Sequence, residues 1–119
     1  YLGLLRHLDA AGLRDQTYTN EHVAGLEAAL AEARGLDIDA VAKLTQLSPR
    51  EIEAFYTLFA RHERVVTVFS QGANQSVTGT DKGNAIINCH LLTGRIGKPG
   101  ASPFSITGQP NAMGGREVG

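Results

Sequence analysis

Two polar stretches contain the residues whose types could do chemistry. The first, from Gln71 to Gln75, reads QGANQ and directly follows an apolar run. Its side-chain amides both donate and accept hydrogen bonds, and Gly72 lets a ligand approach the backbone closely. The second stretch, 107–119, reads TGQPNAMGGREVG and has almost nothing to bury. Something other than a hydrophobic core must therefore use these residues.

The run before the first polar stretch is VVTVF at 65–69. Its β-branched and aromatic residues are typical of a central strand that is buried on both faces of a parallel sheet. Open α/β sheets bind ligands in the crevice beyond the carboxyl ends of their strands, where Gln71, Gly72, Asn74 and Gln75 would lie. A polar turn between a strand and a helix is also common, so this position alone leaves a binding site and a plain turn open.

Helical periodicity dominates the chain up to residue 64. Apolar residues recur at helical spacing around 2–8, 23–30 and 38–44, which predicts three short amphipathic helices. A fourth helix is predicted at 49–62, because Ser48 suits the N-cap, Pro49 the first helical position and Glu51 a capping box. Its apolar stripe contains four residues: Ile52, Phe55, Tyr56 and Phe59.

A fifth helix is predicted after the strand and its polar turn. Its buried face would carry Ala85, Ile86, Cys89 and Leu92, and Gly94 would cap its end. Strand, turn and helix make half of a βαβ unit. A lone strand leaves its backbone groups unpaired on both edges, so we expect the other strands outside this chain. From residue 94 onward we find no clear periodicity, and seven of the 14 glycines lie there.

Composition excludes several classes of function. The formal net charge is −1, so no bulk field points to nucleic acid or an anionic membrane. One cysteine cannot form an internal disulfide or a multi-cysteine metal site. No apolar run approaches the roughly 20 residues that a membrane helix needs. We expect a soluble segment within one domain, with no nucleic-acid partner and no membrane partner.

Three local patterns fail as functional motifs. The letters GRIGKPG at 94–100 lack the glycine spacing and the Ser or Thr of a P-loop. The four histidines have no metal-ligand spacing, which favours ordinary surface or cap positions and predicts no metal ligands: His7, His22, His62 and His90. The predicted helices at 37–46 and 49–62 resemble a helix-turn-helix. The second helix, however, lacks the face of basic and amide side chains that a DNA-binding helix presents to the major groove.

Residues 69–119 carry a family resemblance. They contain G-x-N-Q after a strand, then HLLTGRIGKPG, then TGQPNAMGGREVG. This order resembles the catalytic subunits of bis(molybdopterin guanine dinucleotide) oxidoreductases, and most closely the bacterial assimilatory nitrate reductases. The resemblance implies an α/β fold in which this mostly helical chain, with one central parallel-type strand, is part of a larger Rossmann-like domain. Residues 1–64 would form its helical segment, and 65–119 a strand-turn-helix with a Gly-rich, cofactor-facing loop.

The resemblance also implies an enzyme that reduces nitrate to nitrite at molybdenum. Gln71 and Gln75 would line the cofactor, with Gly72 and Asn74 as neighbours. Thr107 and Gly108 would belong to the same cofactor-binding set. Gln109 matches a glutamine near the molybdenum, and Arg116 matches the arginine at the base of the substrate funnel, where a planar guanidinium can hold an oxyanion.

Departures from other family members favour one branch. Formate dehydrogenases of this group have an arginine where Thr107 stands, which favours nitrate over formate or another substrate of the family. Periplasmic nitrate reductases usually have Met at the position of Gln71, which favours the cytoplasmic assimilatory branch.

The same resemblance places the cysteines for a [4Fe-4S] cluster and the molybdenum ligand outside this chain. Partners would therefore be nitrate, an electron-donor protein or reductase subunit, and the rest of the same polypeptide. Alone, the chain is expected to be inactive. The alternative from another class is a standalone helical interaction module without catalysis.

Overall fold

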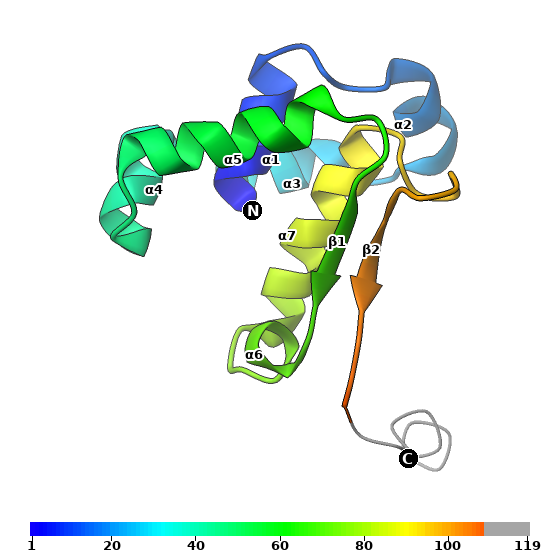
Figure 1. Cartoon of the computed structure of the whole chain (residues 1–119). Helices are drawn as coiled ribbons and strands as arrows, with labels where there is room; N and C mark the ends of the chain where they lie inside the picture. The colour runs from blue at the N-terminus through cyan, green and yellow to red at the C-terminus, as the bar shows by residue number, and fades with distance from the viewer. Residues whose placement is uncertain (109–119) are drawn as a thin grey trace.

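The computed structural model describes residues 1–108, which are mostly helical and contain a two-stranded sheet. No helix in this range is both long and apolar enough to cross a membrane. The elements follow in the order α1 (Leu2–Ala10), α2 (Gln16–His22), α3 (Leu26–Ala33), α4 (Ile38–Thr45), α5 (Pro49–Arg61), β1 (Val66–Phe69), α6 (Gln71–Asn74), α7 (Gly79–Leu92) and β2 (Ser102–Ser105). Figure 1 shows both strands running the same way beside α7, with α6 near their carboxyl ends.

The hydrophobic core is centred on α1. Leu4, Leu5 and Leu8 are fully buried and pack against apolar side chains of α3, α5 and α7. The predicted helices at the start of the chain and around 26–30 and 38–44 are confirmed, although Val23 precedes α3 instead of belonging to it. The break falls at Gly25, whose positive φ of 73° is a conformation that favours glycine.

Helix α2 has no apolar stripe, and the periodicity did not predict it. Its sequence QTYTNEH buries only Thr19. The helix is started by Asp15, whose carboxylate accepts a hydrogen bond from the backbone N–H of Tyr18 at 2.9 Å. A capping carboxylate thus marks this helix where hydrophobic spacing does not.

The N-terminus of α5 has the predicted capping box. The hydroxyl of Ser48 accepts from the backbone N–H of Glu51 at 3.3 Å, and Glu51 Oε2 accepts from the backbone N–H of Ser48 at 2.9 Å. Ile52, Tyr56 and Phe59 of the predicted stripe are buried. Phe55 departs from that stripe because it remains 39% exposed.

Strand β1 pairs with β2 in parallel, from Val66 opposite Ser102 to Phe69 opposite Ser105. The expectation that all partner strands lie outside the chain was therefore wrong, because one comes from the glycine-rich tail. The sequence of β2, SPFS, did not predict a strand because it lacks an apolar run and includes Pro103. Proline is tolerated in edge strands, where its missing N–H leaves no ladder bond unmade.

The two faces of β1 differ in burial, so the prediction of a strand buried on both faces was wrong for the part of the chain described. Thr67 is 8% exposed, on the face that α7 covers. Val66 and Val68 are 49% and 56% exposed on the other face, and Phe104 of β2 is also 56% exposed. Side chains alternate between the faces of a strand, so helix cover on one face leaves the other open.

The helix α7 matches its prediction closely. The four residues of its expected core face, Ala85, Ile86, Cys89 and Leu92, are all buried. The helix ends at Leu92, Thr93 is its C-cap, and Gly94 follows with a positive φ of 59°. A side chain at position 94 would also clash with the carboxylate of Asp15, so glycine is needed there for both conformation and space.

Replacing Ser48 with alanine tests the capping box. We expect S48A to lower the free energy of unfolding by about 1 kcal/mol, because the backbone N–H of Glu51 loses its acceptor and the Glu51 carboxylate loses the hydroxyl that donates to it. Urea denaturation followed by circular dichroism measures the loss. Thr57→Ala, at an exposed position of the same helix, is the matched control and should not destabilise the chain. Equal stability of S48A and the parent chain would contradict the role of the cap.

Candidate functional site

The chain leaves both strands at the same edge of the sheet. The backbone N–H of Ile106 donates to the carbonyl of Phe69 at 2.9 Å, which continues the strand pairing by one residue. The hydroxyl of Ser70 then donates to the carbonyl of Ile106 at 2.8 Å. These bonds hold residues 70–75 beside residues 105–107, at the edge where open α/β sheets bind ligands.

Five polar side chains gather at this edge and form what we name the carboxyl-end cluster: Ser70, Gln71, Asn74, Ser105 and Thr107. The side-chain amide of Gln71 donates to the hydroxyl of Thr107 at 3.5 Å, and that of Asn74 donates to the hydroxyl of Ser105 at 3.1 Å. The structure thus brings together three predicted site residues from two distant segments. Ser70 and Ser105 were missed, since only the unpredicted pairing of β1 with β2 places them here.

Asn74 contributes an unusual atom to the cluster. Its side-chain oxygen is buried and accepts no hydrogen bond within the described part of the chain. A buried acceptor without a donor is costly, and such atoms in native proteins call for a specific partner. This oxygen is the strongest local sign that the carboxyl-end cluster binds something beyond residues 1–108.

The remaining predicted residues border the cluster. Among the described residues, no heavy atom beyond the chain neighbours and the local helix backbone lies within 4 Å of the place where a Cβ of Gly72 or Gly108 would stand. Gln75 is exposed, and its backbone N–H donates to the carbonyl of Gln71 at 2.9 Å, which closes the short helix α6. The two predicted catalytic residues, Gln109 and Arg116, lie outside the described residues.

Gly79 is a third residue that sequence reasoning missed. A Cβ at this position would overlap the backbone carbonyl of Asn74, so only glycine allows the tight passage from α6 to α7. Its backbone N–H donates to the carbonyl of Ser76 at 2.8 Å. Gly79 therefore holds the segment that presents Asn74.

His90 is fully buried, which corrects the expectation of a surface or cap position. Its Nε2 lies 2.7 Å from the hydroxyl of Thr67, so one bond joins α7 to β1. Burial, helped by the nearby charge of Arg95, lowers the pKa of His90 to about 4, and the ring is neutral at pH 7. The burial of His90 could have been predicted from its spacing of four residues from Ile86, which places both side chains on one face of the helix.

The carboxyl-end cluster contains amides and hydroxyls and no ionisable side chain. It can donate and accept hydrogen bonds, but it offers no general acid or base and no strong charge. Within residues 1–108, no three His, Cys, Asp or Glu side chains stand together in a way that could hold a metal ion. The cluster is therefore suited to a ligand rich in polar heteroatoms.

Comparison with known proteins gives close relatives, although no family model matches the chain. The chain is 44% identical over 119 residues to a nitrate reductase of Klebsiella oxytoca, an alignment of 100% of this chain and 13% of that protein. It is 44% identical to a nitrate reductase of Shewanella frigidimarina, over 98% of this chain and 13% of that protein. A nitrate reductase of Synechocystis is 40% identical over 98% of the chain and 16% of its own length.

These alignments make the chain a homologue of oxidoreductases. More particularly, it is homologous along its whole length to a segment of the nitrate reductases, as the motifs in 69–119 predicted. The similarity also includes the helical residues 1–64, where no specific motif was found. The chain spans 13 to 16% of the length of these curated relatives.

Lowering the pH from 6.5 to 4 should destabilise the chain through His90. Its pKa in the folded state is about 4, whereas an unfolded histidine has a pKa of about 6.5. Between these values the unfolded chain binds more protons, so the free energy of unfolding falls as the pH falls. The slope from this group is at most about 1.4 kcal/mol per pH unit.

Urea denaturation between pH 4.5 and 7.5 measures this slope. His90→Gln keeps a polar side chain beside Thr67 but cannot titrate, so its pH dependence should be smaller than that of the parent chain. His22→Gln, on the exposed end of α2, is the matched control and should keep the parental slope. The assignment to His90 is wrong if H90Q and H22Q show the same pH dependence.

Proposed function

We propose that the chain is a segment of the catalytic subunit of a molybdenum oxidoreductase that reduces nitrate to nitrite. The observation that carries the proposal is 44% identity to a nitrate reductase over all 119 residues. Relatives named for nitrate favour this substrate over formate. Similarity that extends through the helical residues 1–64 disfavours a standalone helical interaction module.

We further propose that the segment lies within a larger Rossmann-like domain. The parallel pairing of β1 and β2, with two helices in the connection, supports this proposal because parallel strands need such crossovers. The open apolar face formed by Val66, Val68 and Phe104 supports it too, since parallel sheets in such domains are covered on both faces. The rest of the same polypeptide would supply that cover.

The carboxyl-end cluster fits the bis(molybdopterin guanine dinucleotide) cofactor that the resemblance implies. Pterin and guanine rings carry many donors and acceptors, which match neutral amides and hydroxyls better than one strong charge. Gln71, Asn74 and Thr107 would hold these heteroatoms, and the side-chain oxygen of Asn74, which accepts no hydrogen bond within residues 1–108, would accept from one of them. Gly72 and Gly108 would leave room for a bulky ligand beside the backbone.

When bound, the cofactor supplies the redox chemistry, in which nitrate takes up two electrons and two protons to give nitrite and water. This chain's part is to position the cofactor and the substrate. Gln75 would line the cofactor beside the cluster. By the resemblance, Arg116 would bind nitrate through its planar guanidinium, and Gln109 would stand near the reacting centre. These two residues lie outside the described part of the chain.

Electrons would reach the site from beyond this chain. We propose a [4Fe-4S] cluster bound by another segment of the polypeptide and an electron-donor protein or reductase subunit as its source. The resemblance to the assimilatory branch supports a cytoplasmic enzyme. The formal net charge of −1 gives no strong positive field that would favour binding to nucleic acid or to an anionic membrane, so we propose neither as a partner.

A segment exchange tests the proposed function. Residues 1–119 would replace the aligned segment of the Klebsiella oxytoca nitrate reductase, and nitrite formation would be measured with a reduced viologen donor. We expect the exchanged enzyme to reduce nitrate. An enzyme that folds and keeps its molybdenum but forms no nitrite would contradict the proposal.

Three variants of the exchanged enzyme separate the proposed roles. Arg116→Lys should raise the KM for nitrate about tenfold or more, because a charged, bidentate hydrogen bond is lost, and should keep the molybdenum content. Asn74→Leu should lower the molybdenum and pterin content severalfold. Arg34→Gln, an exposed substitution on the helical side, is the control and should change neither quantity.

The isolated 119-residue chain should produce no nitrite under the same assay. The proposal places the iron–sulfur cluster and the cysteine that ligates molybdenum outside it, so the chain alone cannot assemble the reaction centre. Nitrite formation above the rate without protein would contradict this expectation. A mixture with the intact relative serves as the positive control.

A further inference from the structure

A cavity of about 490 Å³ lies at the amino ends of the two strands, away from the carboxyl-end cluster. Three connections line it: residues 12–15 before α2, residues 62–64 before β1, and the segment that leads from α7 to β2. We name it the loop cavity. These connections lie at the end of the sheet opposite α6 (Figure 1), and the loop cavity shares no residue with the carboxyl-end cluster.

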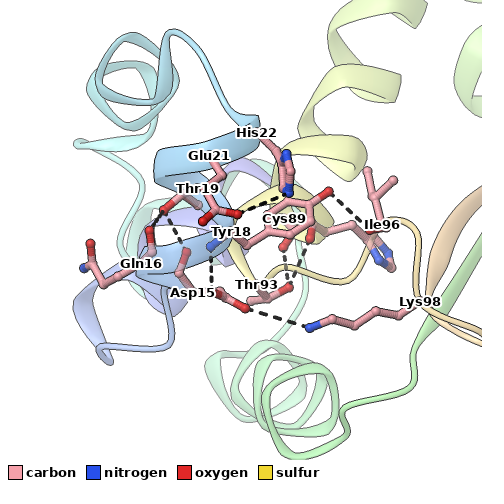
Figure 2. A network of polar contacts seen from close by, with 11 residues as sticks. Asp15, Gln16, Tyr18, Thr19, Glu21, His22, Cys89, Thr93, Ile96 and Lys98 are labelled. Atoms are coloured by element: carbon pink, nitrogen blue, oxygen red, sulfur yellow. Dashed lines mark hydrogen bonds and ion pairs between the residues drawn. The ribbon is translucent and has the colours of Figure 1, made fainter.

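Cations outnumber carboxylates around the loop cavity. Its lining includes four cationic side chains and two carboxylates. The cations are Arg14, Arg64, Arg95 and Lys98, and the carboxylates are Asp15 and Glu63. Lys98 reaches the Asp15 carboxylate at 3.8 Å, as Figure 2 shows, and Arg14 lies 3.6 Å from the carboxylate of Glu27. Arg64, Arg95 and the carboxylate of Glu63 make no ion pair within residues 1–108, so the unpaired side chains of the lining leave one net positive charge.

Fixed contacts hold the wall of the loop cavity in place. Figure 2 shows the Tyr18 hydroxyl, which donates to the carbonyl of Ile96 at 3.2 Å, and the Asp15 carboxylate, which accepts from the backbone N–H of Tyr18 and caps α2. These bonds join α2 to the segment that carries Lys98. The part of the cavity wall between α2 and the segment that leads from α7 to β2 is therefore held by these hydrogen bonds.

Arg95 is the unusual member of the lining because it is only 5% exposed. Its Nη2 donates to the carbonyls of Phe59 at 2.9 Å and His62 at 2.6 Å, and its guanidinium lies 4.4 Å from the Phe59 ring centroid. Its Nη1 is buried with no hydrogen-bond partner in the described residues. The two bonds to the end of α5 thus explain the position of Nη2, but they give Nη1 no partner.

A buried guanidinium without a carboxylate is energetically costly. Burial lowers the pKa of Arg95, and the group that acts in the opposite direction is the buried thiol of Cys89 and not a carboxylate. Carbonyl dipoles and one aromatic face offset only part of the lost hydration. An anion in the adjoining cavity would supply the missing countercharge.

We propose that the loop cavity binds a ligand that carries a phosphate group. Arg64 and Lys98 are exposed and would donate directly to its oxygens, above the buried charge of Arg95. Several cations from separate connections favour a multiply charged, tetrahedral anion over a single carboxylate. The volume of about 490 Å³ is that of a small-molecule site and exceeds what a bare phosphate needs. This proposal does not depend on the proposed nitrate reduction.

Inorganic phosphate is the probe for a first test. The 119-residue chain would be titrated with phosphate at constant ionic strength, and backbone amides would be followed by two-dimensional NMR. We expect saturable shifts confined to the connections at 12–15, 62–64 and 93–101. Acetate at the same ionic strength should give much smaller shifts. Equal responses to both anions would mean that a carboxylate suffices, which would overturn the assignment to phosphate, as would the absence of saturation.

Charge-removing variants form the second test. Arg64→Gln and Lys98→Gln should each weaken phosphate binding about fivefold, since each removes one charge near the bound anion. Arg34→Gln removes the same charge outside the loop cavity and should bind as the parent chain does. Both pocket substitutions are at exposed positions, and thermal unfolding would verify their folding. Parental affinity in R64Q and K98Q would overturn the proposal.

Discussion

The parallel pairing of β1 with β2 is the interaction on which the arrangement of the chain depends. It joins Val66–Phe69 to Ser102–Ser105, segments separated by two helices. Because the strands are parallel, the chain must cross over between them, and α7 covers one face of the sheet as it does so. Both carboxyl ends then meet at one edge and form the carboxyl-end cluster. Both amino ends meet at the other edge, where the connections enclose the loop cavity.

Buried contacts fix this sheet to the helical layer. The bond between Thr67 and His90 links β1 to α7, and the Phe59 and His90 rings form a T-shaped pair with a centroid distance of 5.3 Å. Arg95 then ties the end of α7 to the end of α5 through two carbonyls. The same few residues therefore connect core, sheet and cavity wall. Burial keeps the His90 ring neutral, and it removes from the Arg95 guanidinium the water that would otherwise solvate its charge.

Local signals predicted much of this fold and part of the site. Periodicity and capping predicted α1, α3, α4, α5 and α7, because each buries an apolar stripe or starts at a capping side chain. The strand β2 was missed because SPFS has no apolar run, and its pairing is a long-range property. For that reason Gln71 and Asn74 could be predicted from their position after a strand, whereas their neighbours Ser105 and Ser70 could not. The burial of His90 likewise depends on what packs over α7.

We have proposed that the carboxyl-end cluster faces the cofactor of a nitrate-reducing enzyme. The most direct measurement is an experimental structure of the full-length enzyme that contains this segment, with its cofactor bound. We expect the side-chain oxygen of Asn74 to accept a hydrogen bond from the cofactor, at about 3 Å. A structure in which this oxygen is bonded to another polypeptide segment, with the cofactor beyond reach of the cluster, would contradict it.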